Sequence, residues 1–97
     1  MCRLEIIANN TVEEDIQKAL NDIEDGFYYT RINNVHGRGG SSPRMGDAVW
    51  PEENFIYTIY TDDGTAKKMV DAINEIKKKF VIEGIKVFKV CYEDVEL

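Results

Sequence analysis

The chain has 97 residues, of which 43% are hydrophobic and 31% are charged, and it carries a net charge of -6. A chain of this length forms one domain with a modest core. Its acidic balance argues against nucleic-acid binding, which depends on Lys and Arg to neutralise phosphates. Because no apolar run approaches the roughly 18 residues of a membrane span, we expect a single cytoplasmic domain, 1–97, that starts near Met1 without a signal peptide.

The first part of the chain predicts a strand, a helix and a second strand. Residues 2–8 alternate in polarity as a strand does. Thr11 and Glu14 have the spacing of a capping box, which starts a helix. The helix is expected to have one apolar stripe, made of Val12, Ile16, Ala19, Leu20 and Ile23. Gly26 is expected to end it in a left-handed conformation, and the aromatic and branched residues of 27–35 predict the second strand.

The second part of the chain opens on a long segment without periodicity. Residues 36–53 contain two prolines and four glycines and predict a loop. Residues 55–60 predict a third strand, and the acidic pair at 62–63 predicts the start of a second helix. The stripe of this helix is Ala66, Met69, Val70, Ile73, Ile76 and Phe80. Gly84 turns the chain into a fourth strand at 85–92.

The predicted order β-α-β-β-α-β indicates an α+β, ferredoxin-like fold, with an antiparallel sheet and two helices on one face. Right-handed crossovers place the first and third strands in the centre. The third strand is apolar on both faces: Phe55, Tyr57 and Ile59 point one way, and Ile56, Thr58 and Tyr60 the other. A sheet face without helices is usually polar, so this pattern predicts contact with another copy of the chain. The alternative is a face with scattered exposed apolar residues.

The loop at 37–53 is the first candidate site. It combines glycines with two arginines, three acids and a tryptophan: Arg38, Arg44, Asp47, Glu52, Glu53 and Trp50. Arginines bind phosphate or carboxylate through two parallel hydrogen bonds, so this mixture favours recognition of an anion or of a partner protein. The alternative is a loosely ordered hairpin loop whose Trp50 merely packs on the sheet.

Three weaker signals lie elsewhere. The turn at Gly84 with nearby Lys86 can hold a phosphate, although such a sequence is usually a plain turn. His36, the only histidine, can bind a metal or titrate near neutrality, or it can simply bond a backbone carbonyl at a strand end. Cys2 and Cys91 should lie on neighbouring strands, where they are small buried hydrophobes or, alternatively, a redox pair or a soft-metal site. No nucleophile, base and acid set is visible, so we expect no enzymatic activity.

The whole pattern resembles the nitrogen-regulatory PII family, a class of signal-transduction proteins. The resemblance covers nearly the whole chain and is carried by residues 3–8, 35–39 and 84–88, while residues 43–54 indicate a divergent subgroup with an atypical T-loop. It implies a homotrimer that binds a small effector in the clefts between subunits. It also implies that the T-loop equivalent, 37–53, contacts a target enzyme or transporter, and that Arg44, Asp47, Trp50 and Glu53 are its contact residues.

The resemblance also implies positions for the effector site. The residues carried over from the family are Gly37, Arg38 and Gly39 at the T-loop base, Ile7 and Ile59 near an adenine, and Gly84 and Lys86 near phosphates. ATP, ADP or AMP is the effector that this implies, and no permanent cofactor is expected.

Two positions depart from the family pattern. Gly39 stands where the family usually has glutamine, and Glu53 where it usually has lysine; the end at Leu97 is also short relative to the family. These departures indicate a nucleotide bound differently, another small anion or a metal ion. Two other functions remain open: a metal-binding trimer of the divalent-cation-tolerance type, with His36, Cys2 and Cys91 as ligands, and an interaction module without a small ligand.

Overall fold

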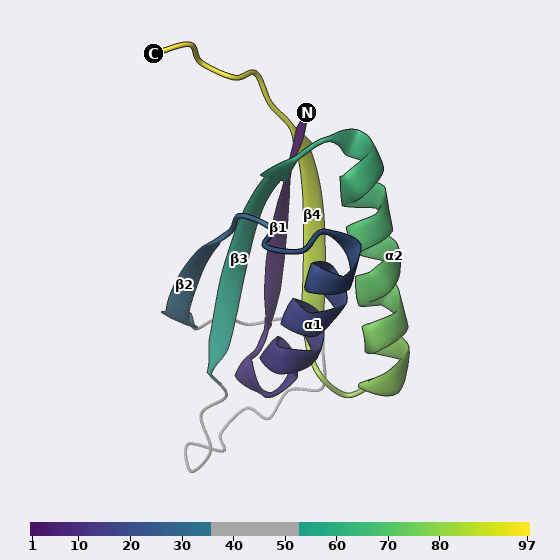
Figure 1. Ribbon diagram of the computed structural model, residues 1–97. Coiled ribbons are helices and arrows are strands. Elements are labelled where there is room, and N and C mark those ends of the chain that lie inside the picture. The colour runs from purple at the N-terminus through teal and green to yellow at the C-terminus, as the bar shows by residue number, and fades with distance from the viewer. Residues whose placement is uncertain (36–52) are drawn as a thin grey trace.

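The fold has the predicted β-α-β-β-α-β order. It is described by a computed structural model for residues 1–35 and 53–97 (Figure 1). The elements are β1 (Cys2–Asn9), a short 3-10 turn η1 (Asn10–Val12), α1 (Glu13–Ile23), β2 (Thr30–Val35), β3 (Asn54–Thr61), α2 (Asp63–Lys79) and β4 (Ile85–Cys91). Within the described residues, no helix is both long and apolar enough to cross a membrane.

The four strands form one antiparallel sheet in the order β2-β3-β1-β4. The predicted central position of the first and third strands is therefore confirmed. Both helices pack on the same side of the sheet, and the other side stays uncovered (Figure 1). The ferredoxin-like α+β class is confirmed by this arrangement.

The core lies between the helices and the covered face of the sheet. Alternate residues of the two central strands point into it and are almost fully buried: Cys2, Leu4, Ile6 and Ala8 of β1, and Phe55, Tyr57 and Ile59 of β3. The helices contribute the predicted stripes, including Ile16 and Leu20 from α1 and Met69 and Ile73 from α2. Burying each large aliphatic side chain stabilises the fold by roughly 1.5–3 kcal/mol.

The start of α1 differs from the prediction. Thr11 lies in the 3-10 turn and does not cap α1; instead its backbone N–H donates to the side chain of Asn9, 2.9 Å away. The short amide side chain of Asn9 can reach the backbone N–H group two residues further along the chain. The predicted capping box at Thr11 and Glu14 is therefore wrong. α1 begins at Glu13, and the three acidic side chains of its first turn stabilise the positive end of the helix dipole.

Two boundaries around β2 and α2 also follow from local contacts. Gly26 has the expected left-handed conformation, with φ of 69°, but it lies in a turn beyond the helix end at Ile23. Phe27 is 6% exposed and packs in the core, and β2 begins only at Thr30. Asp62 caps α2 as expected, because its carboxylate accepts from the backbone N–H of Thr65 at 2.7 Å.

Candidate functional site

Segments that are far apart in sequence meet at one end of the sheet. β2 ends there at Val35 and β3 begins there, so we call it the insert end, after residues 36–52 that join these two strands. The backbone N–H of Asn10 donates to the carbonyl of Glu53 at 2.9 Å, and that of Asn9 donates to the carbonyl of Gly84 at 3.3 Å. Two of the predicted site positions, Glu53 and Gly84, therefore flank the same β1–η1 junction.

The uncovered side of the sheet, called the open face below, is largely apolar. It carries Arg3, Glu5 and Ile7 of β1, Ile32 of β2, Ile56, Thr58 and Tyr60 of β3, and Lys86, Phe88 and Val90 of β4. Ile32, Tyr60 and Phe88 are between 49% and 55% exposed, although each is a large hydrophobic side chain. The predicted apolar character of both sheet faces is confirmed.

Ile7 and Lys86 are neighbours on the open face. They are directly paired across β1 and β4, and Ile7 is also paired with Ile56 of β3, which is in turn paired with Ile32 of β2. This row crosses the whole sheet close to the insert end. In this row the exposed side chain of Lys86 lies beside three apolar ones. Lys86 is the second residue of β4, two positions after Gly84.

Ile59 does not share this surface. It is 2% exposed in the core and is paired with Leu4, whereas Ile7 lies on the opposite face of the sheet. Successive strand residues point to opposite faces, so an even-numbered residue of β3 is needed to join Ile7 on the open face. That residue is Ile56, whose face was predicted from alternation but whose pairing with Ile7 was not, because the register of β1 against β3 has no local signal.

Other predicted site residues lie outside the described part of the chain. These are His36, Gly37, Arg38, Gly39, Arg44, Asp47 and Trp50. Within residues 1–35 and 53–97, no group of three His, Cys, Asp or Glu side chains is arranged to hold a metal ion. Cys2 and Cys91 are paired across β1 and β4, as expected, but only Cys2 is buried. Cys91 is exposed because it is the last residue of its strand, so its interpretation as a buried hydrophobe is wrong.

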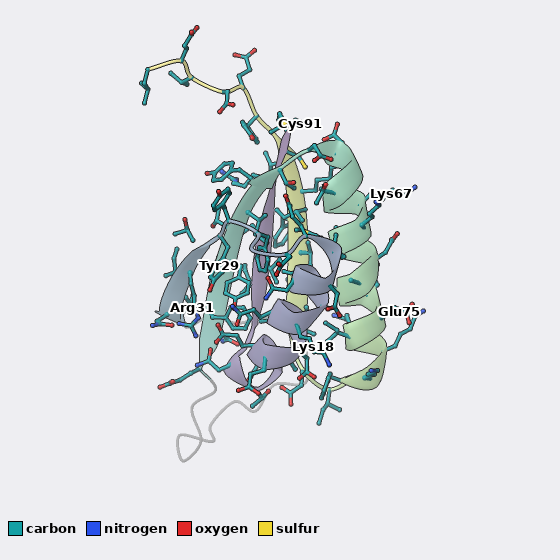
Figure 2. All side chains as sticks on the ribbon, in the orientation of Figure 1. Lys18, Tyr29, Arg31, Lys67, Glu75 and Cys91 are labelled. Atoms are coloured by element: carbon teal, nitrogen blue, oxygen red, sulfur yellow. The ribbon has the colours of Figure 1, made fainter. Side chains whose placement is uncertain are left out.

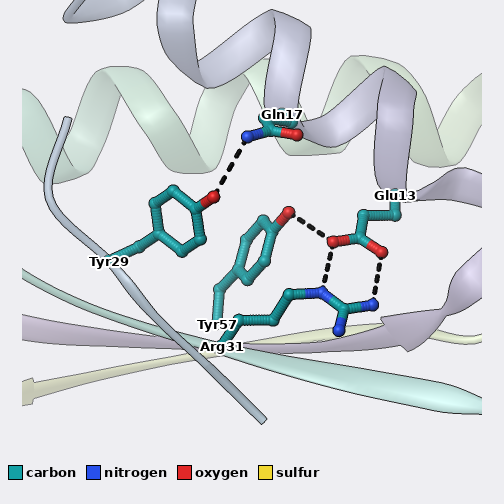
Figure 3. A network of polar contacts seen from close by, with 5 residues as sticks. All are labelled: Glu13, Gln17, Tyr29, Arg31 and Tyr57. Atoms are coloured by element: carbon teal, nitrogen blue, oxygen red, sulfur yellow. Dashed lines mark hydrogen bonds and ion pairs between the residues drawn. The ribbon is translucent and has the colours of Figure 1, made fainter. Parts of the chain in front are cut away.

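A polar network on the covered face holds the strand that leads into residues 36–52 (Figure 3). The guanidinium of Arg31 in β2 donates twice to the carboxylate of Glu13 at the start of α1, with Nη2 2.6 Å from Oε1. The hydroxyl of Tyr57 in β3 donates to the same carboxylate at 2.7 Å. The Arg31 hydrogen bonds hold the pKa of Glu13 below its ordinary value, and burial, together with Glu13, raises the pKa of Tyr57.

Aromatic rings extend this network along the sheet. Tyr57 packs between Tyr29 and Phe55, with ring centroids 4.8 and 4.7 Å away, and Tyr29 packs in turn on Phe27 at 5.1 Å. The guanidinium carbon of Arg31 lies 5.7 Å from the centroid of Phe55, within range of a cation–π contact. The edge strand β2 is thus fixed against α1 and β3 just before the chain enters residues 36–52.

Replacing Tyr57 by phenylalanine should lower the free energy of unfolding by about 1 kcal/mol. The ring contacts remain in this variant, but the Glu13 carboxylate loses one of its donors. Urea unfolding followed by circular dichroism measures the change. Tyr28→Phe is the matched control, because Tyr28 is 91% exposed and should tolerate the same change without loss. Equal stability of the wild type and Tyr57→Phe would contradict the role assigned to this hydroxyl.

No protein-family model matches the sequence, and no curated protein does. Solved structures do match the fold. CPII from Thiomonas intermedia K12, bound to ADP and bicarbonate, has 18% identity and a TM-score of 0.68, over 91% of this chain and 81% of that one. The same protein bound to ADP, AMP and acetate has 19% identity and a TM-score of 0.69, over 92% and 82%.

The chain has a PII-like fold. A candidate PII-like signalling protein from Thermus thermophilus supports this at 18% identity and a TM-score of 0.60, over 91% of this chain and 82% of that one. The expected resemblance is confirmed at the level of the fold. In this PII-like fold, residues 36–52 connect the edge strand β2 to the central strand β3, at the sheet end that carries Gly84 and Lys86.

Proposed function

We propose that this chain is a PII-like regulatory protein rather than an enzyme. It assembles as a homotrimer, binds a small anionic effector in the clefts between subunits, and contacts a target enzyme or transporter through residues 37–53. The observation that carries this proposal is the PII-like fold, shared over 91% of the chain with a structure of CPII bound to ADP and bicarbonate. An adenine nucleotide is therefore the first effector to test.

The open face supports assembly. Its exposed Ile32, Tyr60 and Phe88 would leave water when copies of the chain meet sheet to sheet. Arg3 and Glu5 lie among them as an ion pair, with Nη2 and Oε2 3.9 Å apart.

The insert end supports the effector site. An anion bound beside Lys86 and the Gly84 turn would lie next to the end of β1, which also bonds the Glu53 backbone just before the start of β3. Lys86 provides a positive charge in a chain of net charge -6. An effector that contacts both the sheet and residues 37–53 favours one arrangement of that segment over others, and so changes which target surface it presents.

Replacing Lys86 by glutamine should weaken effector binding about tenfold, which corresponds to the loss of one charge-assisted hydrogen bond. Titration calorimetry against ATP, ADP, AMP and bicarbonate measures the dissociation constants. Lys89→Gln is the matched control, because Lys89 is exposed on the same strand but on the other face, paired with Leu4.

The two lysine variants separate a local contact from a general effect of charge. Equal weakening in Lys86→Gln and Lys89→Gln would contradict a site at the insert end. Absence of binding across the whole panel would remove the effector from the proposal and leave a trimeric interaction module.

A further inference from the structure

The two cysteines of the chain meet at the sheet end opposite the insert end. Cys2 opens β1 and Cys91 closes β4, and the two residues are direct partners in the antiparallel pairing (Figure 2 labels Cys91 beside the chain's N-terminal end). Direct partners have Cα atoms roughly 4.5–5.5 Å apart and point to the same face. A disulfide requires a Cα separation of about 4.4–6.8 Å, so this pair meets the requirement.

The two thiols differ in access, although both are free. Cys2 is 0% exposed, and its Sγ lies 3.9 Å from the backbone carbonyl oxygen of Asp62. Cys91 is exposed. A small molecule in solution can therefore reach Cys91 directly, whereas Cys2 can be reached most easily by its strand partner. Burial also raises the pKa of the Cys2 thiol, which keeps it protonated and unreactive toward solvent.

We propose that Cys2 and Cys91 form a reversible intrachain disulfide by exchange with a low-molecular-weight disulfide. The Cys91 thiolate attacks the small disulfide, forms a mixed disulfide and releases one small thiolate. The Cys2 thiol then attacks the Cys91 sulfur, closes the Cys2–Cys91 bond and passes its proton to the second small sulfur, which leaves as a thiol. The two protein thiols lose two electrons and two protons, and the small disulfide is reduced to two thiols.

The disulfide would act on the base of the C-terminal segment. Cys91 is followed by Tyr92, whose ring packs edge-on against Tyr60 with centroids 5.2 Å apart. Tyr60 belongs to the open face. Oxidation would fix the end of β4 to β1 and hold Tyr92 next to the surface proposed to pack between subunits. This redox input lies at the end of the sheet remote from the effector site, and the bond forms within one chain whether or not the chain assembles.

The test uses the full chain incubated with oxidised glutathione, followed by mass spectrometry after alkylation in denaturant. The wild type should lose both free thiols without retaining glutathione. Cys2→Ala should stop at one glutathione on Cys91, because no second thiol resolves it. Cys91→Ser should remain unmodified, because Cys2 is buried. The oxidised wild type should melt on the order of 10 °C above the reduced form, with no such shift in Cys91→Ser.

Two results would overturn formation of the intrachain bond: glutathione that persists on Cys91 of the wild type, or disulfide-linked chains on a non-reducing gel. Cys2 is a core residue, so Cys2→Ala is checked for folding by circular dichroism. If that variant does not fold, the mass of the oxidised wild type and its melting shift against Cys91→Ser still decide the question. Return of both thiols on addition of reduced glutathione is expected, and a bond that resists it would contradict the reversible role.

Discussion

Replacing Phe88 by aspartate is expected to convert the proposed homotrimer into single chains. Phe88 is 53% exposed in the single chain and lies on the open face, midway along the edge strand β4, where it is paired with Glu5 of β1. Assembly through this face would bury its ring. The new carboxylate would have to be desolvated at the interface and would lie beside the Glu5 carboxylate, at a cost of several kcal/mol per copy. Light scattering on a sizing column measures the molar mass directly.

Val81→Asp is the matched control for the Phe88 variant. Val81 is 77% exposed and lies in the turn between α2 and β4, away from the sheet surface. Val81→Asp therefore replaces an exposed apolar side chain by the same charged one without changing the open face, so the proposed trimer should persist. Circular dichroism checks that both variants stay folded. A Phe88→Asp protein of unchanged molar mass would contradict assembly through the open face.

Replacing Glu13 by glutamine is expected to lower the free energy of unfolding by about 2 kcal/mol near neutral pH. The side chain keeps its shape but loses the charge that accepts from Arg31 and Tyr57. The side chain of Glu13 is only 20% exposed, so water can compensate little for the weakened hydrogen bonds. Chemical unfolding of the wild type and the variant measures the difference.

The acid side of the stability profile tests the same contact independently. Hydrogen bonds from Arg31 hold the folded pKa of Glu13 below its ordinary value of 4.5. The stabilisation is therefore complete above pH 4.5 and is lost as pH falls through the lower folded pKa. Glu13→Gln should show a shallower loss of stability below pH 4.5 than the wild type. Glu14→Gln, at the exposed next position, should keep the wild-type profile, and identical profiles in the two variants would contradict the account.

The fold was predictable because its signals are local and repeated. Alternation along β3 assigns Phe55, Tyr57 and Ile59 to the core and the intervening residues to the open face, as observed. Right-handed crossover places β1 and β3 in the centre. The helix start was less predictable, because Thr11 and Asn9 both offer a side-chain acceptor at a suitable distance and the tertiary path of the chain selects Asn9.

The candidate site was only partly predictable. Gly84 and Lys86 were proposed from a local turn pattern and the family resemblance, but the closeness of Gly84 to Glu53 depends on backbone bonds through Asn9 and Asn10. Ile59 was placed beside Ile7 from the family pattern alone, whereas the strand register puts the two residues on opposite faces of the sheet. The Glu13 network had no local signal, since its residues are 18 and 44 positions apart and meet only when β2 packs beneath α1.

We propose above all that this PII-like chain works as an effector-binding trimer. Native mass spectrometry of the full chain in the presence of ADP tests it most directly, because one spectrum reports both assembly and ligand. We expect the mass of three chains, with further peaks shifted by bound nucleotide. A spectrum dominated by the mass of one chain would contradict the trimer, and a trimer that never gains nucleotide would contradict ADP as its effector.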